Sequence, residues 1–575
     1  VTGYYNAAVR ILMPLLAVGL LLLCGRMLLR RRRKPRPLAA FVLEDGTRLP
    51  VTAEETAIGR STVSDICLPV QSVSRRHAVL TRDKTGWRLR DTRSKGGVTV
   101  NGEPIRVPTY LEYGDRVAFA GVGMRFVKAT AQDAQTADGG KKEPSAIPGL
   151  FVLTIFQLLG CLSLLLHYAD KLPLALPVCF AGLLLMEWIY CGVRRFQGVG
   201  VELLAFFLVT IGLFVAASAV PSSLYKQFAA VLLGLAMFCV LSLILRDVEL
   251  TMKLRYVIGA LAVGLLVLNL FIGETRGGAK NWINLGFITI QPSEFVKVAF
   301  IFAGCATLER LMTYRNTILF VLFSGACIGP LFLMKDFGTA AIFFMGMLII
   351  AYMRSGDWKT IAFFSGLAVA GAAVIIAFMP YVASRFATYR HAWEYAASSG
   401  YQQTRTMVAI GSGGLFGVGG GNGNLDMVAA ADTDLVFGML CEEWGLLIAL
   451  LAVVSIVTLA LFAARACRVG RSSFYTIAAC AASSLLVFQT CLNVFGSVDL
   501  LPLTGVTFPF VSNGGSAMMS AWGLLAYLKA TDTRENASFA IARRHQRQLT
   551  QEARRRAEPV RDPFDTEKEG RHEED

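Results

Sequence analysis

The sequence predicts a mainly α-helical polytopic membrane protein that carries one small all-β domain. Hydrophobic residues make up 54% of the 575 residues and charged residues only 17%, a balance typical of chains with many membrane-spanning helices. Apolar runs long enough to cross a bilayer recur from residue 148 onward. Between residues 38 and 128 short alternating segments are separated by Gly, Asp and Asn turns, which predicts strands.

Residues 1–34 are predicted to form a membrane anchor with a basic stop. The apolar segment 11–29 is long enough to cross a bilayer, and RRRRK follows it at once. A cleaved signal peptide carries its charges before the apolar core. The order found here predicts an uncleaved anchor whose C-terminal side lies in the cytoplasm.

Residues 38–128 contain four motifs in a fixed order: GRS at 59–61, DICLP at 65–69, SRRHAVL at 74–80 and VNG at 100–102. This set resembles the forkhead-associated (FHA) domain, a β-sandwich that binds phosphothreonine peptides. A phosphate dianion needs a guanidinium fork and short hydroxyl or amide donors on rigid loops. The resemblance assigns Arg60 and Ser74 to the phosphate, Arg75 as a second contact and Lys95 as a further charge.

Two further FHA positions are assigned structural roles by the same resemblance. His77 braces the phosphate-binding loop from inside, and Asn101 belongs to the VNG turn. One position departs from the family, because the asparagine that bonds the peptide backbone is Gly96 here. The resemblance therefore implies phosphate binding and leaves the peptide specificity open. The polar, aperiodic segment 129–147 is predicted to be a flexible linker.

The remaining chain is predicted to form a membrane domain, with an extra transmembrane hairpin at 148–192, a core at 199–530 and a charged cytoplasmic tail at 531–575. The predicted spans are 148–168, 172–192, 199–220, 226–245, 254–273, 292–309, 316–334, 337–353, 360–379, 434–464, 473–495 and 505–528. This threading puts the loops 274–291, 380–433 and 496–504 outside and the basic clusters inside.

Basic residues at the ends of these spans explain most of the net charge of +15. Examples are Arg194 with Arg195, Lys253 with Arg255, and Arg465. Such an excess marks cytoplasmic loops and contact with membrane lipids, so no nucleic acid partner is predicted. The twelve cysteines are scattered without a CxxC pair and the five histidines are isolated, so no metal site is assigned. The sequence requires no cofactor and leaves a divalent cation open.

Six ordered motifs then resemble the SEDS proteins, the FtsW, RodA and SpoVE group of cell division, elongation and sporulation. They are GGAKNWINLG, QPSEFVK, KDFGTA, SGYQQTRTMVAIGSGGLFGVGGGNG, DTDLVFGMLCEEWG and LLPLTGVTFPFVSNGGS. The resemblance implies a peptidoglycan glycosyltransferase of the bacterial plasma membrane. Such an enzyme polymerises lipid II, the undecaprenyl pyrophosphate-linked disaccharide-peptide, at the outer membrane face. It also implies a class B penicillin-binding protein as a partner.

Lipid II contacts are assigned to residues of these motifs. Lys297, the lysine after QPSE, is the clearest, and Gln402 belongs to the GYQ motif. Arg276 and Lys280 are candidate pyrophosphate contacts, with an ordinary loop charge as the equal alternative.

Five carboxylates are assigned to the helical bundle. Glu294 and Asp336 are expected to cap or pair within the bundle rather than to do chemistry. Charged residues inside a span are costly, so Glu442 and Glu443 are expected to be functional or internally paired. Asp434 is the last residue of the stretch 429–434.

The chain departs from the family at the outer loop. The family's catalytic aspartate corresponds to Tyr395, with Glu394 beside it. A tyrosine is a poor base at neutral pH because its phenol titrates near ten. The usual P-E-A-H-T-D reads AAADTD at 429–434, which puts Asp432 at the histidine position, and Asn513 stands where tyrosine is usual.

Three hypotheses from different classes follow. The first is a glycosyltransferase, directed to its place by FHA recognition of a phosphothreonine protein, in which Glu394 replaces the missing base. The second is a catalytically impaired scaffold that recruits phosphoproteins. The third is a lipid II transporter. The first ranks ahead because Glu394 is adjacent to the expected site and loops tolerate shifts of register.

Overall fold

The computed structural model describes residues 2–531 with internal gaps. The residues left out are 1, 30–36, 53–54, 61–63, 75–76, 83–85, 93, 131–144, 169–173, 246–247, 277, 287–288, 310–313, 356–357, 379–382, 384–385, 468–472 and 532–575. Arg75, most of the predicted linker 129–147 and almost all of the predicted tail 531–575 therefore lie outside the described residues.

The segment between the anchor and the linker folds into two β-sheets. The strands are β1 (Ala39–Leu43), β2 (Arg48–Val51), β3 (Glu55–Gly59), β4 (Ile66–Cys67), β5 (Ala78–Arg82), β6 (Trp87–Asp91), β7 (Val98–Val100), β8 (Glu103–Pro104), β9 (Thr109–Leu111), β10 (Arg116–Phe119) and β11 (Val122–Lys128). One sheet has the order β2-β1-β11-β10-β7-β8 and the other β4-β3-β5-β6-β9. The predicted all-β sandwich is confirmed.

The β domain has a hydrophobic core of its own. Phe41 lies 5.2 Å from Phe126 and 6.0 Å from Phe119 between ring centroids. These rings belong to a buried cluster that contains no residue of the helical body. Because alternate residues of both sheets supply this core, the domain has what it needs to fold alone.

The helical body contains most of the remaining elements. Its helices are α1 (Thr2–Leu29), α3 (Ile147–His167), α4 (Ala175–Val193), α5 (Gly200–Ala219), η1 (Pro221–Ser223), α6 (Leu224–Ile244), α7 (Val248–Ile272), α8 (Pro292–Glu309), α9 (Tyr314–Leu333), α10 (Phe337–Ser355), α11 (Trp358–Phe378), α13 (Tyr401–Gly413), η2 (Leu425–Met427), α14 (Val436–Trp444), α15 (Leu446–Cys467), α16 (Ser473–Ser497) and α17 (Gly515–Ala530). A small antiparallel sheet of β12 (Glu274–Arg276), β13 (Ala279–Asn284) and β14 (Thr289–Ile290) follows α7.

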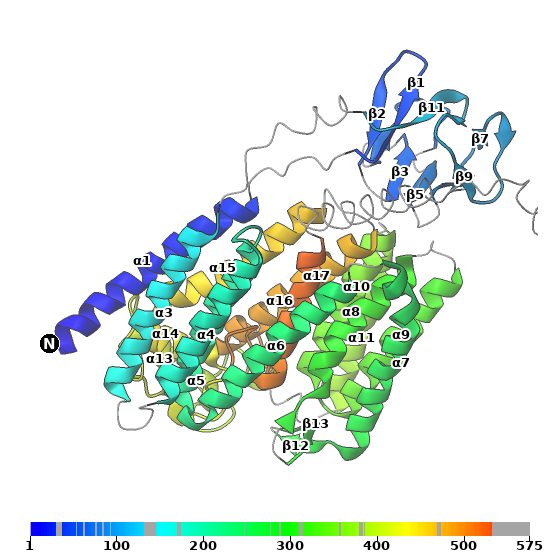
Figure 1. The fold of residues 1–575 in the computed structure, drawn as a ribbon. Helices are drawn as coiled ribbons and strands as arrows, with labels where there is room; N and C mark the ends of the chain where they lie inside the picture. Colours follow the sequence, from blue (N-terminus) through cyan, green and yellow to red (C-terminus); the bar gives the residue numbers. More distant parts are fainter. Residues whose placement is uncertain are drawn as a thin grey trace, which may run out of the picture.

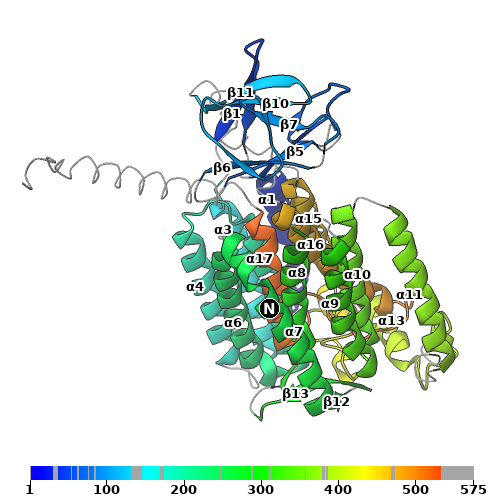
Figure 2. The same ribbon diagram turned by 90° about the vertical axis from the view of Figure 1, so that its right-hand side faces the viewer.

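Within the described part of the chain, nine helices are long and apolar enough to cross a membrane. The apolar window of α5 is buried over its whole length, so this helix forms the centre of the bundle. The prediction of a mainly α-helical polytopic membrane protein is confirmed. In Figures 1 and 2 the β domain lies at the end of the bundle where α1 and α17 end, and the β12–β13 hairpin lies at the opposite end.

A buried polar cluster joins the extra hairpin, α3 and α4, to the central helix α5 through hydrogen bonds. The side-chain amide of Gln157 on α3 donates to Glu187 on α4 at 2.8 Å and to Thr210 on α5 at 2.9 Å. All three side chains are buried. Hydrogen bonds between apolar helices fix their register, so this cluster defines how α3 and α4 pack on α5.

The predicted span 434–464 is wrong, because the structure divides it into α14 and α15 at Gly445. This glycine has φ of +88°, and a residue in the left-handed region ends a helix. A Cβ at this position would lie 2.4 Å from the carbonyl oxygen of Leu415. Consequently Glu442 and Glu443 lie on the short helix α14 and not within a long span.

The predicted span 505–528 is also wrong at its start, because α17 begins only at Gly515. Residues 501–514 form neither helix nor strand. Pro509 removes a backbone donor and restricts the residue before it, which disfavours a helix here. Ser512 stabilises the irregular segment, because its hydroxyl donates to the carbonyl oxygen of Thr433 at 2.7 Å.

Candidate functional site

Three loops of the β domain meet at Ser74. The backbone N–H of Arg60 donates to the carbonyl oxygen of Ser74 at 3.0 Å. The Ser74 hydroxyl accepts a hydrogen bond from the backbone N–H of Lys95, also at 3.0 Å. The side chains of Arg60 and Lys95 are both exposed. The structure therefore brings together the three described residues that the sequence assigned to phosphate.

His77 connects two of these loops from inside the sandwich. Its side chain is fully buried. The backbone N–H of Ser74 donates to Nδ1 at 3.0 Å, and Nε2 lies 2.9 Å from the carbonyl oxygen of Gly97. Since Nδ1 accepts, Nε2 carries the proton and donates to Gly97. This geometry is the bracing role that the sequence assigned to His77.

Asn101 and Gly96 lie in two further loops of the β domain. Asn101 has φ of +51° and bonds the start of β10, because its amide donates to Asp115 and accepts from the N–H of Arg116, both at 2.9 Å. A Cβ at Gly96 would lie 2.3 Å from the Cβ of Ala120. The close approach of Ala120 therefore excludes any side chain at Gly96, including the family's asparagine.

In the helical body, Lys297 and Glu294 form a buried ion pair on α8. Their charged atoms are 2.7 Å apart, and the side chains are 1% and 5% exposed. The three-residue spacing puts both on one face of the helix, and Ser520 on α17 donates its hydroxyl to the same carboxylate. Glu294 also lies in the first turn of α8, where the helix dipole favours a negative charge.

Two of the other predicted lipid II contacts, Lys280 and Gln402, bond elsewhere in the described structure. Lys280 donates through Nζ to the carbonyl oxygens of Leu270 and Phe271, at 2.9 and 3.2 Å, and thereby caps the last turn of α7. Gln402 donates to the carbonyl oxygen of Ala429 at 2.9 Å. The side chain of Arg276 lies outside the described residues.

Two bundle carboxylates act as helix caps. Asp336 accepts from the backbone N–H of Thr339 at 3.1 Å, and from the side-chain amide of Asn281 at 2.7 Å. Glu442 accepts from the backbone N–H groups of Asn424 and Leu425, at 3.1 and 3.0 Å, and so caps η2. Side-chain oxygens are the usual acceptors for the unpaired N–H groups that open a helix.

Glu443 and Asp434 also take part in backbone hydrogen bonds within the helical body. Glu443 is buried beside Glu442, and its carbonyl oxygen accepts the N–H of Gly419 at 2.9 Å. The carbonyl oxygen of Asp434 accepts from the amide of Asn493 at 3.0 Å. Glu443 therefore connects α14 to the Gly-rich segment 413–423, and Asp434 connects the residues before α14 to α16.

The predicted base Glu394 lies on an exposed turn beside Tyr395. The backbone N–H of Glu394 donates to His391 at 2.9 Å, while the carbonyl oxygen of Tyr395 accepts from Ser398 and Gly400 at 2.9 and 3.0 Å. These bonds fix the register of the turn, so an exchange of the two positions has to break them. Both side chains are exposed.

The family is decided by a match over more than half of the sequence. Residues 199–536 match the family described as cell cycle proteins of the FtsW/RodA/SpoVE type. The chain belongs to this family. Residues 56–120 match the FHA domain. Membership in the FtsW/RodA/SpoVE family, together with the apolar helices, makes the chain a multi-pass membrane protein.

Several relatives of the FtsW/RodA/SpoVE region carry the name of an activity. A probable peptidoglycan glycosyltransferase FtsW of Tolumonas auensis is 33% identical over 293 residues, which are 48% of this chain and 74% of that protein. The peptidoglycan glycosyltransferase RodA of Mycobacterium tuberculosis is 28% identical over 323 residues, 53% of this chain and 69% of that protein. A solved structure described as a peptidoglycan synthase complex is 26% identical and covers 58% of this chain and 98% of its own, with a TM-score of 0.49.

Sequence reasoning missed one contact within the FtsW/RodA/SpoVE region. Asp432 and Asn513 both replace usual family residues, and the structure joins them. The Asn513 amide donates to the Asp432 carboxylate at 2.8 Å, and the Asn513 backbone N–H donates to the Asp432 carbonyl oxygen at 2.9 Å. The two residues that differ from the family, Asp432 and Asn513, therefore bond each other. In the sequence, the only indication of this contact was that both positions depart from the residues usual in the family.

Among the described residues, no group of three or more His, Cys, Asp or Glu side chains is arranged to hold a metal ion.

Proposed function

We propose that this chain polymerises lipid II into glycan strands on the outer face of the plasma membrane, in cell division or cell-shape control. The observation that carries the proposal is the family match over residues 199–536, whose relatives are named peptidoglycan glycosyltransferases. The FHA domain then binds a phosphothreonine protein in the cytoplasm. A class B penicillin-binding protein is the proposed partner, as the family resemblance implies.

The buried pair on α8 supports a site for the pyrophosphate of lipid II. Lys297 lies two turns or less from the end of α8 that adjoins the β12–β14 sheet, opposite the FHA end (Figure 1). Its ammonium group is enclosed, so contact with a ligand requires α8 and α17 to separate at their outer ends. In the bound state the lysine exchanges Glu294 for the pyrophosphate, a dianion that attracts it strongly at a low-dielectric edge.

The proposed base is Glu394, and its amide variant tests that role. Positioned acid-base catalysis is typically worth about 10²–10⁴-fold in rate, so Glu394→Gln should slow polymerisation by roughly that factor. The measurement is glycan strand formation from lipid II by the purified full-length protein. His391→Gln, on the same exposed turn, is the control and should keep the wild-type rate. An active protein that Glu394→Gln leaves unchanged would contradict the assignment of the base.

A second candidate function is a catalytically impaired scaffold, favoured by Tyr395 at the position of the family's aspartate. The variant Tyr395→Asp distinguishes the two candidates in the same assay. If the natural protein is inert and Tyr395→Asp forms glycan strands, the natural chain is a scaffold that binds lipid II without polymerising it.

The orientation proposed here gives a separate prediction. Ser398 is exposed on the 391–400 turn, so Ser398→Cys should react with a membrane-impermeant maleimide on intact cells. Glu103→Cys, exposed on β8 of the FHA domain, is the matched control and should react only after lysis. Labelling in the reverse order would overturn the orientation.

A further inference from the structure

The β domain turns one of its two sheets toward the helical body. In Figures 1 and 2 the sheet β4-β3-β5-β6-β9 lies on the side of the domain nearer to the bundle, and the sheet with β1 and β11 lies beyond it. Neighbouring residues of a strand point to opposite faces of its sheet. Trp87 and Leu89 of β6 are buried in the sandwich. Arg88 and Arg90 therefore point outward, on the side of the helical body.

The residues that lie across from these arginines are uncharged. Arg88 lies opposite Thr81 of β5 and Tyr110 of β9. Arg90 lies opposite Val79 of β5. These described cross-strand neighbours therefore include no carboxylate to neutralise either guanidinium group. Tyr110 is 50% exposed. We call Val79, Thr81, Arg88, Arg90 and Tyr110 the arginine–tyrosine face.

The outward face of the other sheet differs in one respect. It also carries two arginines, Arg116 and Arg125, which lie opposite each other on β10 and β11. The described residues of its strands include no exposed large hydrophobic side chain. Charge is therefore common to both sheets, whereas arginine beside an exposed aromatic ring is found on the sheet nearer to the bundle.

Two connections keep the β domain close to the membrane. Helix α1 ends at Leu29 and β1 begins at Ala39, while β11 ends at Lys128 and α3 begins at Ile147. Both α1 and α3 are long and apolar enough to cross a membrane. At about 3.5 Å per residue, the segment 30–38 reaches at most about 35 Å. A domain held in this way meets the membrane surface at high effective concentration, so contacts that are weak singly are sufficient.

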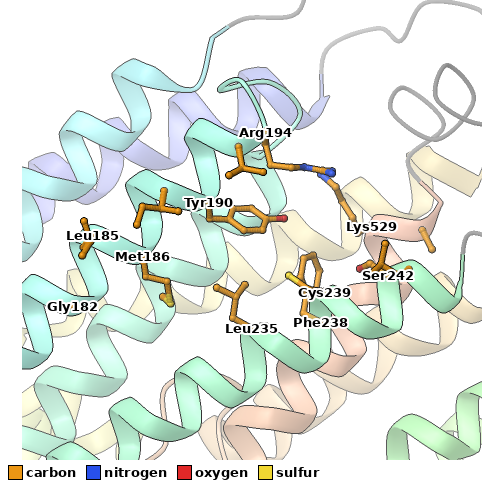
Figure 3. Close-up of a pocket in the computed structure, with 14 residues that line it drawn as sticks. Gly182, Leu185, Met186, Tyr190, Arg194, Leu235, Phe238, Cys239, Ser242 and Lys529 are labelled. Atoms are coloured by element: carbon orange, nitrogen blue, oxygen red, sulfur yellow. The ribbon is translucent and has the colours of Figure 1, made fainter. Parts of the chain in front are cut away.

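The helical body marks the level of the lipid headgroups on this side. Tyr190 and Arg194 lie at the end of α4, and Lys529 lies at the end of α17 (Figure 3). These are the ends of the helices that adjoin the β domain (Figure 1). Tyrosine and basic side chains are typical of the interface between membrane and water. The arginine–tyrosine face is therefore directed toward the headgroup region.

We infer that the arginine–tyrosine face binds the anionic headgroups of the leaflet on the FHA side. Arg88 and Arg90 contact lipid phosphates, and the ring of Tyr110 lies among the headgroups. Arginine forms charge-assisted hydrogen bonds to phosphate, anionic lipids attract basic side chains near the surface, and a tyrosine ring is favoured at the interface. The loops that carry Arg60 and Ser74 follow β3 and precede β5. They lie at the ends of strands, so the docked domain keeps them open to a phosphopeptide. This inference does not depend on the polymerase activity.

The test is co-sedimentation of the isolated segment 38–128, whose separate core supports independent folding, with lipid vesicles. One kind of vesicle is phosphatidylcholine alone, and the other also contains phosphatidylglycerol. We expect stronger binding to the vesicles with phosphatidylglycerol. The double variant Arg88→Gln with Arg90→Gln should weaken this binding roughly thirtyfold, about fivefold for each arginine. The matched control is Arg116→Gln with Arg125→Gln, which removes the same charge from the other sheet. It should keep most of the binding, because salt screens charges on the far side of the domain.

A third variant tests the aromatic ring. Tyr110→Ser should lower binding to the phosphatidylglycerol vesicles without a change of charge. Thermal unfolding checks that each variant is folded, since none of the replaced residues belongs to the core of the domain. Equal binding of the natural domain to both kinds of vesicle would overturn the inference. Binding to neither would also overturn it and would leave the face to a protein partner. The inference fails as well if the two double variants lose binding to the same extent, because overall charge then accounts for the binding.

Discussion

Replacing Lys297 with methionine is expected to abolish binding of lipid II and to destabilise the helical body. The substitution leaves Glu294 buried without its cation, and breaking a buried pair in this way costs about 3–5 kcal/mol. Loss of the cation also removes an attraction to the pyrophosphate of about 4 kcal/mol at an effective dielectric constant of 20, which corresponds to a loss of roughly three orders of magnitude in affinity. The measurements are thermal unfolding in detergent and binding of lipid II.

The double variant Lys297→Met with Glu294→Gln separates these two effects. It removes both charges, so it should recover most of the stability, because Ser520 still has a side-chain oxygen to bind. Binding of lipid II should remain absent. If the double variant binds lipid II as the natural protein does, Lys297 is a structural residue and the proposed pyrophosphate contact is wrong.

Replacing Arg60 with alanine is expected to abolish phosphopeptide binding by the FHA domain. Removing one partner of a charged hydrogen-bonded contact costs about 2–5 kcal/mol, which weakens binding by roughly thirtyfold or more. The measurement is binding of a phosphothreonine peptide library to the isolated segment 38–128, whose separate core supports independent folding.

Arg125→Ala is the control for this variant, because Arg125 is exposed on β11 of the other sheet. It removes the same charge and should keep the binding. A domain that binds phosphorylated and plain peptides equally well would contradict the assignment of Arg60 and Ser74.

Residues inside compact motifs were predictable because their partners are close in sequence or fixed by the motif. His77 lies three residues from Ser74 and bonds it directly. Asn101 was found through the VNG motif, although its partners Asp115 and Arg116 lie 14 and 15 residues further along the chain. Glu294 was expected to cap or pair within the bundle, and its partner Lys297 lies one helical turn away on the same face. The pairing of Lys297 itself was not predicted. The sequence predicted roles for these residues that depend on local backbone geometry.

Roles that depend on distant segments were not predictable. Lys280 resembles a ligand contact in sequence, but the hairpin turns it back onto the carbonyl oxygens that end α7. Asp432 and Asn513 are separated by 81 residues and bond only because the 501–514 segment lies against residues 432–433. Hydropathy is averaged over a window of many residues, so a single glycine has little effect on it. The helix end at Gly445 was therefore not visible in the hydropathy pattern.

The central claim is that this member of the FtsW/RodA/SpoVE family polymerises lipid II. The most direct measurement is glycan strand formation from lipid II by the purified full-length protein, with and without its cognate class B penicillin-binding protein. We expect strands from the natural protein, and none from the double variant Lys297→Met with Glu294→Gln at the same concentration. A natural protein that forms no strands under either condition, while Tyr395→Asp forms them, would contradict the claim.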